Sequence, residues 1–216
     1  MNYIENVFFC LAAPLIIALF CVHRFRRRSI AFIISGMAAC LCSSYISTFL
    51  AKALGANALE ASLEISPVIE EALKFFPLAL YLLIYDIDER SEAAGEAIMV
   101  AVGFATLENA CYLIANDAGD TAHLLIRGFS TGAMHVACGA ITAIVLRVAW
   151  GTTYYRITAT LGVLCLAITS HGSYNVLVNQ ERAVAWVGYM LPLRLGGITI
   201  VIRRKLYGTV AVLPKP

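Results

Sequence analysis

The sequence predicts an all-α integral membrane protein with about seven transmembrane helices and a polar layer in the extracytoplasmic half of the bilayer. Of its 216 residues, 60% are hydrophobic and 14% are charged, whereas soluble domains carry about 25% charged residues. The mean hydropathy is +0.79. Apolar stretches of about 20 residues, the length that crosses a bilayer core as a helix, recur along the chain. The loops are short, so residues 1–216 are predicted to form one polytopic domain.

The apolar stretches place the spans at residues 3–22, 30–51, 64–84, 94–115, 123–149, 157–178 and 183–202. The first stretch has the length of a signal peptide, but Met1–Asn6 contains no Lys or Arg. The positive cluster Arg24–Arg28 follows the apolar run instead. This order is typical of a retained span whose N-terminus lies outside.

The distribution of Lys and Arg predicts the orientation. With the N-terminus outside, the cytoplasmic segments hold eleven of these residues: Arg24, Arg26, Arg27, Arg28, Arg90, Arg147, Arg156, Arg203, Arg204, Lys205 and Lys215. The outer segments hold only Lys52 and Arg182. Because positive residues accumulate on the cytoplasmic side, we expect a multi-pass protein of the plasma (inner cell) membrane with a cytoplasmic C-terminus. The net charge of +2 and the basic residues at span ends argue against a nucleic-acid partner.

Polar residues within the spans need a reason, because a charge at the bilayer centre costs about 2.5–3.5 kcal/mol on insertion scales. They are Glu70, Glu71, Lys74, Glu108, Asn109, Arg127, His135, His171, Asn175 and Arg194. At a rise of 1.5 Å per residue, Glu70, Glu108 and His171 lie roughly 9–10 Å below the outer ends of their spans. His135 lies about 14–18 Å down. Four helices of alternating direction therefore bring polar groups to one layer, where an active site is predicted.

Several charged residues in or near the spans are predicted to be structural or solvated rather than reactive. Lys74, four residues after Glu70, shares a face with it and is expected to pair with it. Lys74 and Arg127 are interpreted as counter-ions that support the buried glutamates. Arg194, on a Gly-rich span, is left out of the site, and Glu96, near the cytoplasmic end of its span, is predicted to be solvated. The seven cysteines contain no CxxC and are interpreted as small buried hydrophobic residues.

This set of residues favours hydrolysis by activated water. A carboxylate in a low-dielectric site can serve as a base near neutral pH, and a His with an Asn one turn away can donate hydrogen bonds to an oxyanion. There is no GxSxG, although Ser66, Ser130 and Ser170 near the layer leave nucleophilic catalysis open. A divalent metal such as zinc is the other open variant. Its ligands would be His135 and His171 with either Glu108 or Glu70, but the chain has no HExxH.

Four motifs in spans three to six, within residues 64–178, resemble those of PrsW-type membrane proteases. Ser66–Lys74 resembles an EExxK motif, and Gly103–Asn109 with the trailing Tyr112 resembles FxxxEN. Met134-His135 and the HxxxN of His171–Asn175 resemble the third and fourth motifs, in the same order. The wider superfamily includes CAAX prenyl-proteases and bacteriocin-processing membrane proteases, which carry a His where this chain has Glu108. That difference favours the PrsW branch.

The resemblance implies an intramembrane endopeptidase that acts on a membrane-protein substrate, such as an anti-sigma factor cut on its outer side. It implies that Glu70 is the general base on water, supported by Glu71 and Glu108. His135 and His171 would position water or stabilise the oxyanion, with Asn175 assisting. Lys74, Asn109 and Arg127 are the supporting residues.

Two other functions fit the same polar layer. Buried acids and histidines also serve as proton relays in ion- or proton-coupled transporters, although seven spans without a repeat do not match the inverted-repeat plan. A non-catalytic membrane scaffold that retains a polar core is the third alternative. Replacement of Glu70 by glutamine separates a protease from a scaffold, because a protease would lose cleavage whereas a scaffold would keep its biological activity.

Overall fold

The fold was analysed in a computed structural model, which describes residue 8 and residues 11–17, 27–84, 90–115, 121–149 and 153–210. The elements are α2 (Arg27–Leu54), α3 (Ala58–Glu60), the π-helix η1 (Ala61–Ile65), α4 (Ser66–Ile84), α5 (Arg90–Ala115), α6 (Thr121–Ala149), α7 (Thr153–Val178) and α8 (Arg182–Val210). The described chain is all-helical, which confirms the predicted class. The predicted spans from 30–51 to 183–202 each lie within these helices, and most of the predicted span 3–22 lies outside the described residues.

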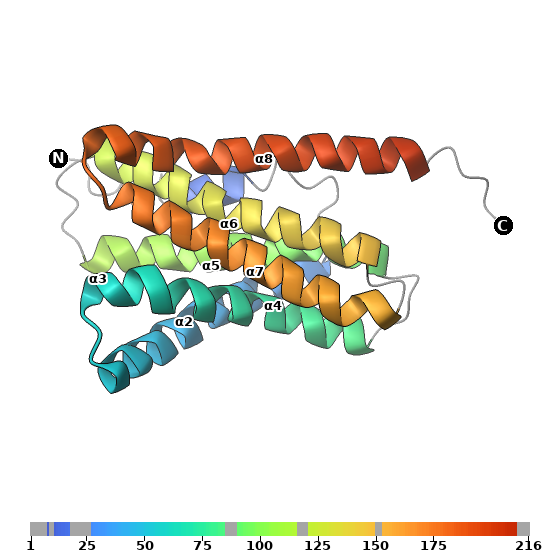
Figure 1. The fold of residues 1–216 in the computed structure, drawn as a ribbon, viewed down its shortest axis with the longest axis horizontal. Coiled ribbons are helices and arrows are strands. Elements are labelled where there is room, and N and C mark those ends of the chain that lie inside the picture. Colours follow the sequence, from blue (N-terminus) through green and yellow to red (C-terminus); the bar gives the residue numbers. More distant parts are fainter. Residues whose placement is uncertain are drawn as a thin grey trace.

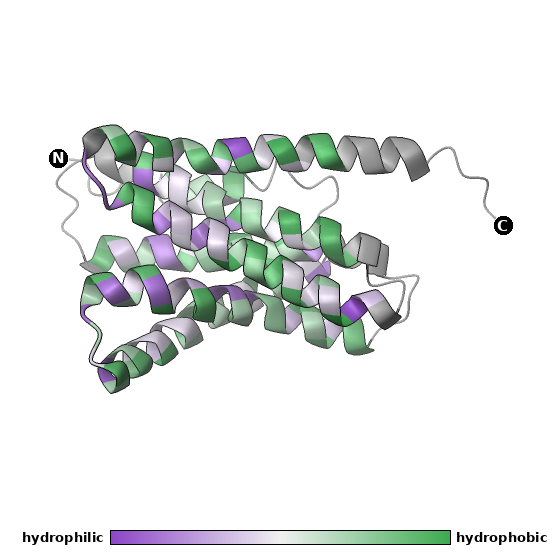
Figure 2. Ribbon diagram, in the orientation of Figure 1, coloured by the Kyte–Doolittle hydropathy of each residue, from purple (hydrophilic) through white to green (hydrophobic). Residues whose placement is uncertain are grey.

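The long helices form one elongated bundle (Figure 1). α5 lies at its centre and packs against α6 and α2, while α4 contacts α2, α5 and α7. α8 lies along one side against α6 and α7. α2 crosses the bundle obliquely and ends beside α3, at the end of the bundle where α8 begins (Figure 1). Apolar residues predominate along the outward-facing helices, which suits a lipid environment (Figure 2).

Four helical segments of the described chain are long and apolar enough to cross a membrane: Arg27–Leu54, Gly95–Ile114, Ile126–Leu146 and Tyr155–Val178. The chain is therefore a multi-pass membrane protein. α4 is not among the four, and it carries Glu70, Glu71 and Lys74 within 19 residues. Its other residues are strongly apolar, so these three charges, rather than its length or overall hydropathy, set α4 apart from the four segments. The total of seven spans remains a prediction.

α2 and α5 approach so closely that their contact requires glycine. A Cβ atom added to Gly36 would lie 2.0 Å from the carbonyl oxygen of Val100, and one added to Gly103 would lie 1.9 Å from the carbonyl oxygen of Ile33. These distances are far shorter than any van der Waals contact, and the obstructing atoms are backbone. Small residues that let two backbones meet are the usual device of helix packing in membranes. This contact fixes α5, and with it Glu108, beside α2.

We expect Gly103→Ala to destabilise the bundle by roughly 1–3 kcal/mol, the usual cost of overpacking. The added methyl group must push α5 away from α2. Gly95→Ala, on the same helix, is the matched control, because a Cβ there meets nothing within 4 Å. Reversible unfolding in mixed micelles measures the difference. Equal stability of the two variants would contradict the close contact.

Glu96 is buried, contrary to the prediction that it is solvated. Its side chain is only 4% exposed, and its Oε1 accepts a hydrogen bond from Arg28 Nε at 2.9 Å. Arg28 Nη1 also donates to the hydroxyl oxygen of Tyr81 at 3.0 Å. The prediction failed because distance along α5 says nothing about which neighbour covers the side chain. Here the Arg28–Glu96–Tyr81 cluster ties α2, α4 and α5 together.

Candidate active site

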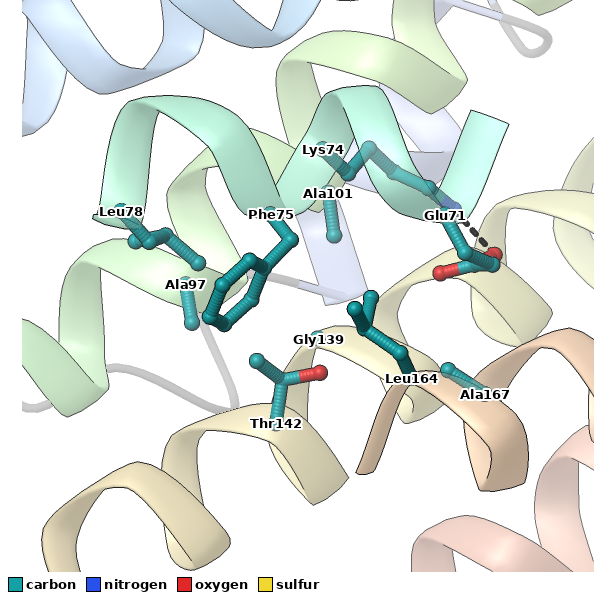
Figure 3. Close-up of a pocket in the computed structure, with 10 residues that line it drawn as sticks. All are labelled: Glu71, Lys74, Phe75, Leu78, Ala97, Ala101, Gly139, Thr142, Leu164 and Ala167. Atoms are coloured by element: carbon teal, nitrogen blue, oxygen red, sulfur yellow. Dashed lines mark hydrogen bonds and ion pairs between the residues drawn. The ribbon is translucent and has the colours of Figure 1, made fainter. Parts of the chain in front are cut away.

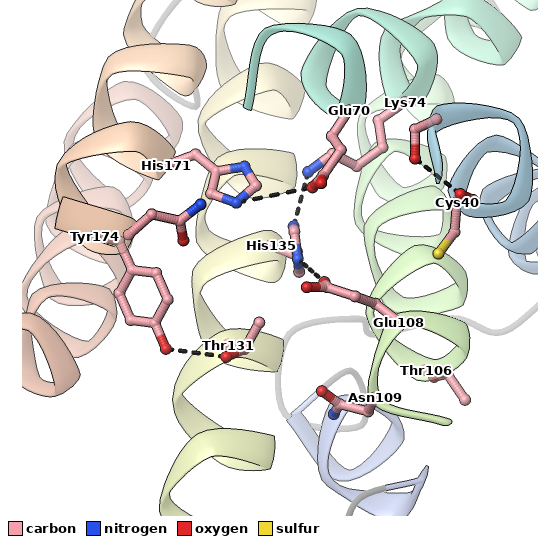
Figure 4. A network of polar contacts seen from close by, with 12 residues as sticks. Cys40, Glu70, Lys74, Thr106, Glu108, Asn109, Thr131, His135, His171 and Tyr174 are labelled. Atoms are coloured by element: carbon pink, nitrogen blue, oxygen red, sulfur yellow. Dashed lines mark hydrogen bonds and ion pairs between the residues drawn. The ribbon is translucent and has the colours of Figure 1, made fainter. Parts of the chain in front are cut away.

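The side chains of the predicted polar layer converge between α4, α5, α6 and α7. Figure 4 shows Glu70 and Lys74 from α4, Glu108 from α5, His135 from α6 and His171 from α7 around one point. Glu71 completes the group through contacts with Lys74 and His171. His135 is fully buried, and Lys74, Glu71 and His171 are each at most 6% exposed. Three carboxylates, two imidazoles and one ammonium group thus share a site that is closed to solvent on most sides.

Lys74 lies at the centre of this network. Its Nζ donates to Glu71 Oε1 at 2.5 Å and lies 2.8 Å from His135 Nδ1. It also lies 4.8 Å from the centre of the Phe104 ring. The pair therefore forms between residues three apart, Glu71 and Lys74, rather than between Glu70 and Lys74 as predicted. Either spacing allows contact on a helix, and the neighbouring helices decided between them.

Lys74 also determines which ring nitrogen of His135 carries the proton. A lysine ammonium group can only donate, so His135 Nδ1 accepts and the imidazole proton lies on Nε2. That nitrogen donates to Glu108 Oε2. The ring of Phe104 packs on His135 with centroids 5.1 Å apart. Glu108 and His135 therefore form one unit whose orientation depends on Lys74.

In His171 the proton lies on the other ring nitrogen, Nδ1. Its Nδ1 donates to Glu71 Oε1 at 2.9 Å, so its Nε2 carries a lone pair when the ring is neutral. Nε2 faces Glu70 Oε2 at 3.8 Å, too far for a hydrogen bond. Glu70 Oε2 is buried without a hydrogen-bond partner among the described residues. A buried polar atom without a partner is uncommon, and it marks Glu70 as the carboxylate with a free acceptor.

The remaining predicted residues surround this centre rather than enter it. Asn175 donates from Nδ2 to the carbonyl oxygen of Ser62 in η1 at 2.9 Å, and Asn109 donates to the carbonyl oxygen of Gly128 at 3.2 Å. The guanidinium carbon of Arg127 lies 3.5 Å from the centre of the Tyr112 ring. These contacts join helices. The oxyanion role of Asn175 stays a prediction, since its described N–H bond is to the backbone.

Two aromatic residues near the site were not assigned from the sequence. Phe104 contacts both Lys74 and His135, and the buried Tyr174 shares a hydrogen bond of 3.0 Å with Thr131. Both lie inside the quoted motifs, so their positions were available as a signal. Their role was missed because an aromatic residue in an apolar span looks like any lipid-facing or core residue.

A small cavity adjoins the Glu71–Lys74 pair (Figure 3). It has a volume of about 10 Å³, and Phe75, Leu78 and Leu164 contribute apolar walls. Such a volume corresponds to about one water molecule. The cavity is therefore not the cleft that would hold a peptide.

The donor set fits a divalent metal. One ligand atom from each of Glu70, His135 and His171 can be chosen so that all lie within 4.8 Å of one another. Glu71 would serve as the outer carboxylate that orients His171, a common arrangement around metal-binding histidines. In the described conformation both nitrogens of His135 have neighbours, Lys74 and Glu108. Binding through His135 would thus require one of them to move, and of the two predicted carboxylates Glu70 is the free one.

Helices of membrane-spanning length surround the buried carboxylates and imidazoles. The fold and the site therefore define a multi-pass membrane protein with a buried acid–imidazole site. Residues 14–201 match the family described as PrsW family intramembrane metalloprotease. The match covers most of the chain, and the chain belongs to this family. The resemblance inferred from the motifs is confirmed.

Similarity to a curated protein supports the same family. The chain is 28% identical over 141 residues to the protein named Protease PrsW of Bacillus subtilis (strain 168). The aligned region is 64% of this chain and 62% of that relative. No solved structure matches the chain.

Proposed function

We propose that this protein is an intramembrane endopeptidase that hydrolyses a peptide bond of a membrane-associated protein with water activated by Glu70. The observation that carries the proposal is the buried Glu70 Oε2, which faces His171 Nε2 at 3.8 Å and has no hydrogen-bond partner in the described chain. A carboxylate oxygen and an imidazole nitrogen so placed can bind one water molecule between them. The name of the Bacillus subtilis relative, a protease, supports this reaction.

The proposed reaction is a direct attack of water. Glu70 takes a proton from the water molecule as its oxygen bonds to the peptide carbonyl carbon. The carbon–nitrogen bond of the tetrahedral intermediate then breaks, and the departing amine takes that proton from Glu70. No covalent bond to the protein forms, which agrees with the lack of a GxSxG motif.

The other charged residues hold the reacting groups in place. Glu71 holds the Nδ1 proton of His171, which leaves Nε2 as an acceptor toward the water. Lys74 neutralises Glu71 and keeps the proton of His135 on Nε2. His135 and Glu108 form the opposite wall. The Nε2 proton of His135 would stabilise the oxyanion by turning from Glu108 to the substrate oxygen. Asn175 holds η1 against α7 and so places the start of α4.

A divalent metal fits the same reaction. Glu70, His135 and His171 would hold it, and a bound zinc or similar ion supplies a more acidic water and a Lewis acid for the carbonyl oxygen. The chain's own contribution would be the orientation of His171 by Glu71. The description of the family as metalloproteases supports this variant.

Metal binding can be measured apart from activity. We expect Glu71→Gln to weaken zinc binding roughly 10–100-fold, the usual effect of losing an outer carboxylate. Competition with a chromogenic chelator measures the affinity of the purified protein. Glu64→Gln is the matched control, because Glu64 is an exposed acid just before α4. Full hydrolytic activity after complete metal removal would contradict a metal role and leave Glu70 as the sole activator.

The substrate is proposed to be cut in the outer half of the plasma membrane. The cluster Arg27–Arg28 begins α2, and α2 ends beside α3 at the other end of the bundle (Figure 1). The positive-inside rule assigns the arginine end to the cytoplasm, and Glu70 lies in the second turn of α4, which starts near the other end. With that orientation the N-terminus is outside and the C-terminus is cytoplasmic. An anti-sigma factor is the specific substrate that the family resemblance suggests.

The test compares protein N-termini in membrane and outer fractions of cells that carry the wild type or a Glu70→Gln, His171→Gln double variant at equal levels. The double variant removes both groups that face the water, so residual hydrolysis is not expected. Cells that carry the Glu64→Gln variant serve as the control. Mass spectrometry should find N-termini, in or just outside predicted spans, that are present with the wild type and the control but absent with the double variant. These termini would name the substrate.

Identical sets of termini would overturn the proposal. If proton or solute flux in liposomes then separated the wild type from the double variant, the site would belong to a transporter. If neither property differed, the polar cluster would be structural, as in a membrane scaffold.

A further inference from the structure

Arg194 is a charged residue on the outward face of α8, away from the site. It is exposed, and no ion pair or hydrogen bond is found for it within the described residues. The residues that share its face at helical spacing are apolar and also exposed, among them Val187, Met190 and Ile198. The opposite face is the packed one, where Ala185, Pro192 and Thr199 are buried. Figure 2 shows the same pattern, a hydrophilic segment within an otherwise largely apolar α8.

Arg194 lies far from both ends of the span predicted for α8, residues 183–202. Twelve residues separate it from Arg182 and nine from Arg203, or roughly 18 Å and 14 Å along the axis. The interval between these two flanking arginines is about 32 Å, which matches the thickness of about 30 Å of a bilayer core. Arg194 is therefore close to the middle of the bilayer on the face that apolar residues present to lipid.

An arginine at this depth cannot easily reach water. Side chains on a helix tilt toward its N-terminus, which for Arg194 is the direction of the more distant boundary. Snorkelling, the usual escape for basic residues near helix ends, is thus poorly available. A lipid-facing arginine in the middle of a span is costly, and its cost falls when an acidic group of another helix pairs with it.

We propose that the outward face of α8 binds a transmembrane helix of another membrane protein, one that carries an Asp or Glu near the middle of its span. Arg194 supplies the charge complementarity. Gly197, one turn further along the same face, is exposed and has nothing within 4 Å of an added Cβ, so the partner backbone can approach closely there. This surface is separate from the site of hydrolysis, and the proposal does not depend on that activity.

Two other occupants fit less well. A second copy joined through the same face in a two-fold dimer would bring one Arg194 toward the other. The exposed acids of the described chain, Glu60, Glu64 and Glu181, all lie at the end of the bundle where α3 and α8 begin. An anionic lipid would have to draw its headgroup to the middle of the bilayer.

The test uses the full-length protein in phosphatidylcholine vesicles and synthetic single-span helices. The probes are Leu/Ala helices flanked by Lys, with Glu, Gln or Leu at the central position and a fluorescent acceptor at one end. The protein carries a donor dye on a C-terminal tag, and energy transfer measures association. We expect the Glu probe to bind the wild type roughly tenfold more tightly than the Leu probe.

Variants assign the effect to Arg194. Arg194→Leu should reduce binding of the Glu probe to the level of the Leu probe, while Arg194→Lys should retain most of it. Met190→Leu is the matched control on the same face and should bind as the wild type does. Binding of the Glu probe that is equal in wild type and Arg194→Leu, or absent in both, would overturn the proposal.

Two further measurements test the other two occupants of this face, a second copy of the chain and an anionic lipid. Energy transfer between differently labelled copies of the chain that disappears in Arg194→Leu would show a second copy on this face and overturn the proposal. Loss of Glu-probe binding when phosphatidylglycerol is added to the vesicles would assign Arg194 to lipid headgroups instead. Persistence of probe binding in both lipid mixtures, without self-association, is the expected result.

Discussion

Replacement of Glu70 by glutamine is expected to slow peptide-bond hydrolysis by about 10²- to 10⁴-fold, the usual contribution of a general base. Glutamine keeps the size of the side chain but cannot take a proton from water. The environment of Glu70 makes this result specific. Its Oε2 is buried and has no hydrogen-bond partner in the described chain, so the substitution breaks no described hydrogen bond and removes only the 3.8 Å approach to His171 Nε2.

The rate should be measured on purified protein in proteoliposomes, with a substrate segment identified by the N-terminus comparison. Glu64→Gln, in the adjoining η1, removes an exposed acid and should leave the rate unchanged. Equal unfolding midpoints of wild type and Glu70→Gln would show that only chemistry was lost. A Glu70→Gln protein that cleaves at the wild-type rate would exclude Glu70 as the base.

Replacement of Lys74 by methionine is expected to destabilise the protein by about 3–5 kcal/mol, the usual cost of removing one partner of a buried ion pair. The side chains of Lys74 and Glu71 are only 7% and 5% exposed, and Lys74 Nζ lies 2.5 Å from Glu71 Oε1. Without the ammonium group Glu71 remains as a buried charge, and His135 loses the donor to Nδ1 that sets its proton on Nε2. Hydrolysis should fall as well, since the orientation of His135 and Glu108 depends on that proton.

A double variant separates the two effects of Lys74. Glu71→Gln combined with Lys74→Met removes both charges, and it should recover most of the stability because replacement of a whole buried pair is often nearly neutral. It should not recover hydrolysis, since His135 still lacks its donor. Reversible unfolding in mixed micelles gives the stability, with the exposed Lys52→Met as control. Equal losses of stability in Lys74→Met and the double variant would contradict a coupled pair.

Much of the candidate site could be predicted because charge is rare in a membrane span. Glu70, Glu71, Glu108, His135 and His171 stand out against apolar neighbours, and burial of such residues is costly enough to require a purpose. A constant rise per residue then predicts that they meet. The structure brings them into contact, and the match over residues 14–201 places the chain in the family that the motifs resembled.

The pairing within the site could not be predicted, because helical spacing permits more than one partner. Lys74 is within reach of both Glu70 and Glu71, and the choice of Glu71 depends on His171 and His135, which approach from two other helices. That choice is what leaves Glu70 with a free oxygen. Glu96 shows the same limit, since only the position of Arg28 on α2 reveals that it is buried.

The helices and the list of polar residues could be predicted from the amino-acid sequence, because apolar length and the cost of intramembrane charge are local properties. The packing of the helices was needed to show which carboxylate is paired and which is free, how closely α2 and α5 meet at Gly36 and Gly103, and that Arg194 faces outward. These depend on the rotation of each helix about its axis. Packing against the neighbouring helices sets that rotation, and the hydropathy of a single span does not encode it.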